Sequence, residues 1–209
     1  KLTGVLNGID VNSYNPTTDK ALFANYSPEN LEGKTICKKE LQKMLGLPQK
    51  DVPIIAMITR LVSHKGIELV KTVIEDILHE DLQFVLLGTG DAAYENYFRD
   101  LGKRYENKVS ANIAFNGDLS RKIYSGSDIF LMPSVSEPCG LSQMIASRYA
   151  TVPVVRETGG LYDSIKPYGN GGNGFTFASC NAYDMLYVIH EALNTYKNKE
   201  EWTALMKKA

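Results

Sequence analysis

Two cationic side chains in a turn between a buried strand and a helix are the first candidates for chemistry in this sequence. Arg60 and Lys65 lie five positions apart in segment 60–66 (RLVSHKG), which follows an apolar run. Two cations at this spacing can converge on one anion, and Gly66 permits close backbone approach at the start of the helix. A solvated basic turn explains the same residues equally well.

A carboxylate occupies a second turn of this kind, segment 133–141 (PSVSEPCGL). Glu137 could simply favour the start of the next helix, because helix N-termini stabilise anions. Alternatively, it could accept hydrogen bonds from sugar hydroxyls or stabilise a cationic sugar centre. The N–H groups of Gly140 and Leu141 could bind phosphate. Cys139 has no evident partner histidine, which argues against a thiol nucleophile.

A third turn, segment 88–93 (GTGDAA), fits the G-x-G-x-x-A dinucleotide fingerprint. It falls in a middle strand–helix unit rather than the opening one. The next predicted strand, 109–115, ends without the acidic residue expected for a ribose. A structural or phosphate-lining turn is therefore favoured over an NAD site.

A fourth turn, segment 156–161 (RETGGL), combines a hydroxyl with two glycines. The Thr158 hydroxyl and the N–H groups of Gly159 and Gly160 could cradle a phosphate at a helix start. A glycine-rich turn with a threonine cap is the alternative.

Short apolar runs alternate with segments of helical periodicity along the chain. This alternation predicts a Rossmann-like α/β fold, in which a parallel sheet carries helices on both faces. Ligands bind beyond the carboxyl ends of such strands, so the four turns should meet at one edge. Cations, a phosphate cradle and a carboxylate at one edge suit a nucleoside diphosphate attached to a neutral polyol. The predicted strands are 54–58, 83–87, 109–115, 129–132, 152–155 and 174–177, and the predicted helices are 66–80, 91–105, 118–125, 140–149, 181–196 and 200–208.

Length, charge and cysteine content narrow the function classes further. The 209 residues suit one domain over 1–209, with surface loops at 11–30 and 168–174. A net charge of −1 offers no basic surface for nucleic acid. The cysteines form no C-x-x-C pair, so neither disulfides nor zinc are expected, and a reducing, cytoplasmic setting is the default. No apolar run reaches the ~18 residues of a membrane span. The three cysteines are Cys37, Cys139 and Cys180.

Several motifs in the chain resemble those of bacterial glycogen synthases and plant starch synthases. They are R-L-x-x-x-K-G at 60–66, S-x-x-E-P-C-G-L at 134–141, T-G-G-L-x-D at 158–163 and L-N-G-I-D at 6–10. The resemblance covers essentially the whole chain. Broader sugar-nucleotide transferases often carry a second glutamate where this chain has Ile145, as glycogen synthases permit. The resemblance implies the C-terminal half of a GT-B fold, with the N-terminal catalytic domain absent.

The resemblance also implies a reaction and residue roles. Glucose would pass from ADP-glucose to the non-reducing end of an α-1,4-glucan with retention of configuration, and the fragment alone would be inactive. Arg60 and Lys65 would neutralise the diphosphate, and Glu137 would bind glucose hydroxyls. Phe115 would stack on the base. No D-x-D motif is present, so no metal or other cofactor is expected. Substrate or nucleotide contacts are implied for Cys139, Gly140, Leu141, Thr158, Gly159 and Gly160.

Three other functions remain open from the sequence. A different GT-B glycosyltransferase would use a UDP-sugar donor. A non-catalytic nucleotide- or glucan-binding module would bind ligand without depending on Arg60, Lys65 or Glu137. An NAD-dependent enzyme would rest on segment 88–93 alone.

Overall fold

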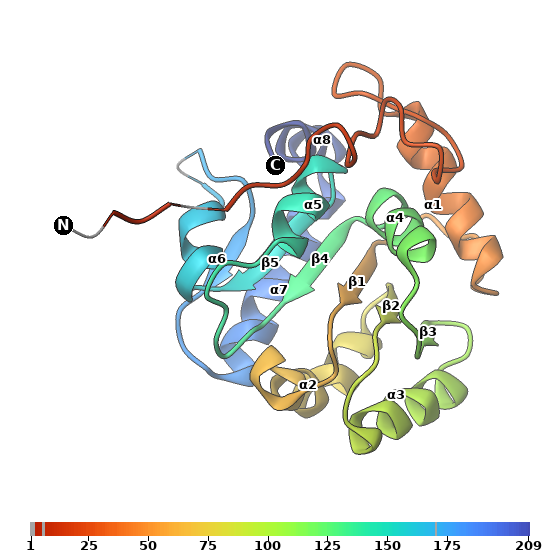
Figure 1. Ribbon diagram of the computed structural model, residues 1–209. Coiled ribbons are helices and arrows are strands. Elements are labelled where there is room, and N and C mark those ends of the chain that lie inside the picture. The colour runs from red at the N-terminus through yellow and green to blue at the C-terminus, as the bar shows by residue number, and fades with distance from the viewer. Residues whose placement is uncertain (1–2, 6, 170) are drawn as a thin grey trace.

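A single six-stranded parallel sheet with helices on both faces organises the computed structural model, which describes residues 3–5, 7–169 and 171–209 (Figure 1). The strand order is β3-β2-β1-β4-β5-β6. Rossmann dinucleotide-binding sheets have this strand order, which confirms the predicted Rossmann-like α/β fold. Residue 6 of the L-N-G-I-D segment and residue 170 of the second predicted loop lie outside the described residues. The strands are β1 (Ile54–Ile58), β2 (Gln83–Leu87), β3 (Val109–Asn112), β4 (Ile129–Met132), β5 (Val152–Arg156) and β6 (Phe175–Phe177).

Helix α1 is the one long element that the sequence pattern did not predict. Its buried face consists largely of small or polar residues such as Gly33, Lys34 and Gln42, so no apolar periodicity marks it. The short helices η1 and α6 also lie outside the predicted helix segments, whereas α2, α3, α4, α5, α7 and α8 follow them closely. The helices are α1 (Glu32–Met44), the 3-10 helix η1 (Ser63–Lys65), α2 (Ile67–His79), α3 (Ala92–Arg104), α4 (Gly117–Gly126), α5 (Ser142–Arg148), α6 (Gly159–Ser164), α7 (Ala182–Lys197) and α8 (Lys199–Lys208).

The sheet separates two apolar layers. In β1, Ile55 and Met57 face the layer that contains α2, α3, α7 and α8, whereas Ile54 and Ala56 face α1, α4 and α5. All four side chains are at most 1% exposed. Because both faces of the sheet are covered, its strands read as continuous apolar runs rather than alternating ones, which is why the sequence predicted them well.

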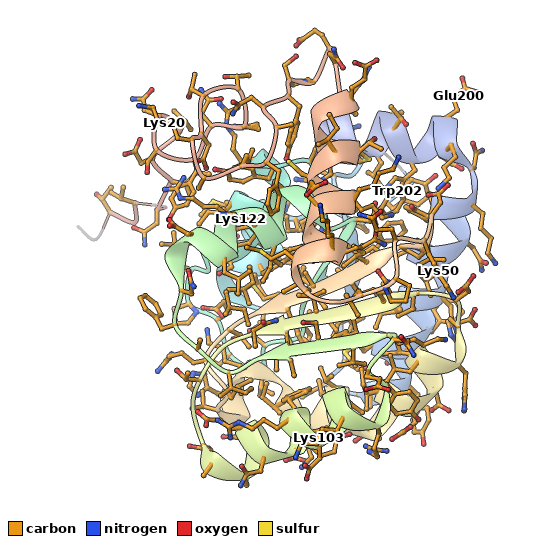
Figure 2. The ribbon with its side chains drawn as sticks, turned by 90° about the vertical axis from the view of Figure 1, so that its right-hand side faces the viewer. Lys20, Lys50, Lys103, Lys122, Glu200 and Trp202 are labelled. Atoms are coloured by element: carbon orange, nitrogen blue, oxygen red, sulfur yellow. The ribbon has the colours of Figure 1, made fainter. Side chains whose placement is uncertain are left out.

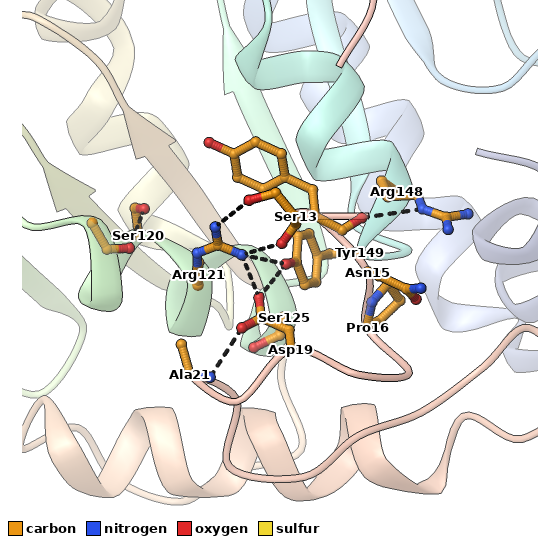
Figure 3. Close-up of polar contacts among 12 residues, drawn as sticks. Ser13, Asn15, Pro16, Asp19, Ala21, Ser120, Arg121, Ser125, Arg148 and Tyr149 are labelled. Atoms are coloured by element: carbon orange, nitrogen blue, oxygen red, sulfur yellow. Dashed lines mark hydrogen bonds and ion pairs between the residues drawn. The ribbon is translucent and has the colours of Figure 1, made fainter. Parts of the chain in front are cut away.

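The predicted loop at 11–30 is irregular as expected, and charged side chains anchor it (Figure 3). The Arg121 guanidinium on α4 donates hydrogen bonds to the Ser13 carbonyl at 2.6 Å and to Asp19 Oδ2 at 2.7 Å. The Tyr149 hydroxyl donates to the same Asp19 oxygen. Arg121 also lies over the ring of Tyr14, with its Cζ 4.6 Å from the ring centroid. This network fixes the loop against α4 and α5.

All six strands point the same way, so the turns that follow them share one edge of the sheet. β3 ends at Asn112 rather than at the predicted position 115, and the turn that follows projects Phe115 into solvent with 98% exposure. Among the described helices, none combines the length and apolarity that a membrane crossing requires.

Candidate functional site

The strand order places a topological switch point between β1 and β4. These strands are neighbours, but the chain continues from β1 to β2 on one side and from β4 to β5 on the other. Doubly wound sheets bind ligands in the crevice that opens at such a point, beyond the carboxyl ends of the strands. Segment 60–66 follows β1 and segment 133–141 follows β4, so two of the predicted turns flank this crevice.

Lys65 and Glu137 form an ion pair across the crevice. Lys65 Nζ lies 2.6 Å from Glu137 Oε2, and the side chains are 14% and 9% exposed. Ser134 Oγ donates a 3.1 Å hydrogen bond to the same carboxylate oxygen. An ammonium has three donors and a carboxylate has two acceptor oxygens. No other described residue bonds to Lys65 Nζ or Glu137 Oε1, so both sides of the pair keep capacity for a ligand.

Backbone contacts hold these two turns together. Lys65 ends η1, and Gly66 follows in the left-handed conformation with φ of 76°. The Val135 N–H donates a 2.9 Å hydrogen bond to the His64 carbonyl. A side chain at position 66 would overlap the carbonyl of Pro133. Glycine is therefore required at this position for its φ and for the close approach of the two turns.

Arg156, the last residue of β5, fixes the turn that carries Glu137. Its Nε donates to the Ser134 carbonyl at 3.0 Å, and its Nη2 donates to the Val135 carbonyl at 2.6 Å. Its Nη1 reaches the Ala178 carbonyl at 3.3 Å. One guanidinium thus joins three loops of the carboxyl edge. The sequence showed only that Arg156 ends a buried strand, and this position does not indicate that its side chain joins the loops.

The glycine pair of the fourth turn packs against the Glu137 turn. The Gly160 N–H donates a 3.1 Å hydrogen bond to the Glu137 carbonyl, so this N–H is already occupied. A Cβ on Gly159 would overlap the carbonyl of Glu137, and a Cβ on Gly160 would overlap that of Cys139. Thr158 precedes α6 without capping it through its side chain. The glycines position the turn, and the threonine hydroxyl stays available.

A pocket of about 220 Å³ lies between the fourth turn, the start of α5 and the N-terminal segment, with Gly160 among its lining residues. Gln143 shapes this region from inside the protein. Its Nε2 donates to the Gly140 carbonyl at 2.9 Å and to Ser164 Oγ at 3.0 Å. The sequence missed this residue, because a buried glutamine within a predicted helix gives no signal of a bridging role.

Arg60 and the glycine turn of segment 88–93 lie farther along the edge. The Arg60 side chain is exposed, and its Nη2 lies 3.4 Å from His64 Nε2. A parallel bridge joins Leu61 to Gly90, and a Cβ on Gly90 would overlap the Leu61 carbonyl. Packing between two turns thus explains the glycines of segment 88–93 without a dinucleotide.

Comparisons with known proteins identify the family of this chain. The sequence profile of glycosyl transferases group 1 matches residues 38–208. The chain belongs to the glycosyl transferases group 1 family. It is 50% identical over its whole length to the glycogen synthase of Desulforamulus reducens, and 53% identical over 99% of its length to that of Kosmotoga olearia. In both cases it covers 44% of the relative, so it spans less than half the length of these curated relatives.

A solved relative gives the same result for the fold. The catalytic domain of starch synthase IV from Arabidopsis thaliana, bound to ADP and acarbose, superposes with a TM-score of 0.94. It is 38% identical to this chain and covers 98% of it, and the match spans 44% of the starch synthase chain. The fold at the described residues is that of one Rossmann-like half of a GT-B glycosyltransferase.

Within this group 1 glycosyltransferase domain, the structure brings some predicted residues together and leaves others apart. Lys65, Glu137 and the turn of Gly159 and Gly160 meet at the switch point, whereas Arg60 and segment 88–93 lie farther along the edge. Leu141 is 46% exposed directly before α5, and Phe115 stands at the β3 end of the edge, separated from β4 by both β2 and β1. Within the described ranges, no three His, Cys, Asp or Glu side chains gather as they would around a metal ion.

Proposed function

We propose that this domain binds the donor in a retaining transfer of glucose from ADP-glucose to the non-reducing end of an α-1,4-glucan. The observation that carries the proposal is the Lys65–Glu137 pair at the switch point, together with an exposed Arg60 in the same turn as Lys65. Such a site offers cations to a diphosphate and a carboxylate to a sugar. The similarity to glycogen synthases, and to a starch synthase seen with ADP and acarbose, supports the choice of base and acceptor.

Arg60 and Lys65 neutralise the charge that develops on the departing diphosphate. Preorganised cations in a partly dry site stabilise such a charge more than water does. Lys65 can hold Glu137 and a phosphate oxygen at once, because its pair with Glu137 uses one of three donors. The Lys65 ammonium would thus contact both the departing diphosphate and the carboxylate that lies beside the sugar. Glu137 Oε1 would accept hydrogen bonds from glucose hydroxyls, without acting as a covalent nucleophile.

The remaining contacts are distributed along the same edge. Phe115 would stack on the base, since its ring is almost fully exposed. The Thr158 hydroxyl and the N–H groups of Gly140, Leu141 and Gly159 would bind phosphate oxygens. Cationic side chains supply the positive charge in this proposal, so it requires no metal ion.

The domain would act together with the rest of a longer enzyme. Residues 1–209 form one nucleotide-sugar-binding unit in this proposal, and an N-terminal domain would supply acceptor contacts and further catalytic groups. The chain alone would bind nucleotide without turnover. Incorporation of labelled glucose into a glucan by the purified 209-residue chain would contradict this part.

Calorimetric titration tests the donor site directly. The parent chain should bind ADP more tightly than UDP and should not bind NAD. The Arg60→Ala/Lys65→Ala variant should bind ADP about 100-fold more weakly, because each charge-assisted hydrogen bond contributes about 1.5–3 kcal/mol. Lys103→Ala/Lys197→Ala removes the same charge from two exposed sites on other helices and should bind ADP like the parent.

Each other outcome has a definite meaning. Tighter binding of UDP would replace ADP-glucose by a UDP-sugar as donor. ADP binding that is equal in the parent and the Arg60→Ala/Lys65→Ala variant would refute the placement of the diphosphate. Selective NAD binding would revive the dinucleotide interpretation of segment 88–93.

A further inference from the structure

A larger pocket, of about 670 Å³, lies at the opposite edge of the sheet, between α1 and α8. Ser127 and Asp128, which directly precede β4, are among its lining residues, as are Lys50 and Trp202, which are labelled in Figure 2. Because the strands are parallel, this amino edge lies across the sheet from the Lys65–Glu137 pair. The pocket therefore belongs to neither the donor crevice nor its loops.

The charged lining of this pocket, called here the lysine pocket, includes two lysines that have no acidic partner among the described residues. Lys38 is already paired with Asp128 at 2.8 Å, and Lys199 lies 3.6 Å from Asp51. Lys39 and Lys50 are exposed and have no ion-pair partner in the part of the chain that the structure describes. The lysine pocket is lined by five lysines and two carboxylates: Lys34, Lys38, Lys39, Lys50, Lys199, Asp51 and Asp128. Lys34 offers no free charge, because burial lowers its pKa to about 7 and its ammonium already donates to the carbonyls of Ser125 and Tyr149 and to the Thr151 hydroxyl.

Two buried polar groups of the lysine pocket lack partners. Ser127 Oγ and Trp202 Nε1 are buried and make no hydrogen bond with any described residue. An unsatisfied buried group costs about 1–3 kcal/mol, and native structures rarely leave one without a bound water, ion or ligand. An indole N–H can only donate, and a lysine ammonium can only donate. Since both unpaired atoms are buried, the groups that a ligand in the pocket would meet are the exposed ammonium groups of Lys39 and Lys50, whose complement is a molecule rich in acceptor oxygens.

Aromatic rings give the lysine pocket a wall as well as charge. Trp202 and Tyr196 pack edge to face with ring centroids 5.3 Å apart. The ammonium groups of Lys38 and Lys199 lie 5.2 and 3.8 Å from the centre of the Tyr196 ring. The volume falls within the range of about 300–1,000 Å³ that is typical of small-molecule sites and exceeds what a bare phosphate ion needs.

We propose that the lysine pocket binds a small organic phosphate ester, at a site separate from the donor crevice. The phosphate would contact Lys39 and Lys50, and the organic part would lie in the rest of the pocket, where it would reach only the small exposed parts of Trp202 and Tyr196, which are 2% and 7% exposed. This inference does not depend on the proposed transfer reaction, because it uses none of the residues at the carboxyl edge.

The single tryptophan of the chain, Trp202, makes this site observable on its own. Glycerol 3-phosphate, titrated into the 209-residue chain at constant ionic strength, should produce a saturable change in tryptophan emission. The Lys39→Ala/Lys50→Ala variant should need at least about tenfold more ligand, because it loses two charge-assisted contacts. The Arg60→Ala/Lys65→Ala variant and the charge-matched Lys103→Ala/Lys197→Ala variant should respond like the parent.

The remaining arms separate the alternatives. Glycerol should cause no change in emission, and inorganic phosphate should bind more weakly than glycerol 3-phosphate. Equal binding of inorganic phosphate and glycerol 3-phosphate would mean that the site recognises phosphate alone, and it would overturn the proposal of an ester site. An absent emission change in a folded chain, or one that sodium chloride reproduces, would refute the pocket. So would a response that persists in Lys39→Ala/Lys50→Ala or disappears in Arg60→Ala/Lys65→Ala. Circular dichroism spectra establish that each variant is folded.

Discussion

Two irregular regions of this domain keep their shape by different means. The loop at 11–30 is held by side chains, with Arg121 22% exposed and bonded to Asp19 and to the Ser13 carbonyl. The turns at the carboxyl edge are held by close backbone approach at glycines, and the side chains of Arg156 and Gln143 brace them from the protein side. There, Arg60 is exposed and contacts only His64 among the described residues. A turn anchored through its backbone leaves its side chains free for a ligand, which suits a binding site.

The largest effect should come from a methyl group at a glycine of the carboxyl edge. In Gly160→Ala the new Cβ would overlap the backbone carbonyl of Cys139, which cannot move as a side-chain tip can. We expect a loss of about 3 kcal/mol in the free energy of unfolding, roughly 6–12 °C in Tm, together with weaker ADP binding. Thermal unfolding followed by circular dichroism measures the first effect and calorimetry the second.

Gly117→Ala is the matched control for that substitution. Gly117 begins α4, and a Cβ there would meet nothing within 4 Å. This variant should be as stable as the parent or up to about 1 kcal/mol more stable, since alanine favours a helix over glycine. If the Tm of Gly160→Ala matched that of Gly117→Ala, backbone contact would not be what holds the carboxyl edge.

Removal of the central cation of the anchored loop should have the next largest effect. In Arg121→Ala, the Asp19 carboxylate, whose side chain is 6% exposed, loses its cationic partner. We expect a loss of about 2 kcal/mol in chemical denaturation, less than for a fully buried pair because Arg121 is partly solvated. Arg60→Ala removes the same charge from the carboxyl edge and should change the free energy of unfolding by at most about 0.5 kcal/mol. Equal losses in the two variants would remove the distinction between the two regions.

A smaller effect should follow from deleting one hydroxyl of the same network. Tyr149→Phe removes the O–H that donates to Asp19 but keeps the ring, which stacks 6.3 Å from that of Tyr124. We expect a loss of about 1 kcal/mol in the free energy of unfolding, the usual net value of one hydrogen bond. Tyr183→Phe, on an exposed ring of α7, should leave stability unchanged. A loss in Tyr149→Phe as large as in Arg121→Ala would mean that the tyrosine rather than the arginine is the main support.

The difference between contacts that are local in the sequence and contacts that are distant explains what the sequence could predict. β1, β2 and β4 match the predicted bounds, because a strand buried on both faces is a continuous apolar run. The residue types at the site were also predictable, since they directly follow those strands. The bridges made by Arg156 and Gln143 were not, because their partners are turns about twenty positions away that only the tertiary fold brings near.

The network around Asp19 was equally invisible in the sequence. Its members, Asp19, Arg121 and Tyr149, are separated by up to 130 positions. Nothing in the composition of the 11–30 segment distinguishes a loop anchored in this way from one that is free in solvent. Only the fold, which brings α4 and α5 beside this segment, creates the contacts.

The smallest expected effect is on how the stability of the protein depends on pH in acid. Burial raises the pKa of Asp19, but hydrogen bonds from Tyr149, the Ala21 N–H and Arg121 outweigh it and lower the pKa below its ordinary value. A carboxyl with a lowered folded-state pKa binds fewer protons folded than unfolded. Its stabilising contribution is therefore complete above the unfolded value of about 3.9 and is lost as pH falls through the folded pKa.

Comparison of the parent with Asp19→Asn isolates this contribution from those of the other carboxyls that titrate in the same range. The stability difference between the two proteins should be constant from neutral pH to about pH 5 and should shrink below about pH 4. Urea unfolding at a series of pH values measures it. A difference that stays constant down to the acid-unfolding limit would mean that the Asp19 charge does not contribute to anchoring. The loop would then be held by the contacts of Arg121 with the Tyr14 ring and with the Ser13 carbonyl, that is, by packing and backbone contact, as at the carboxyl edge.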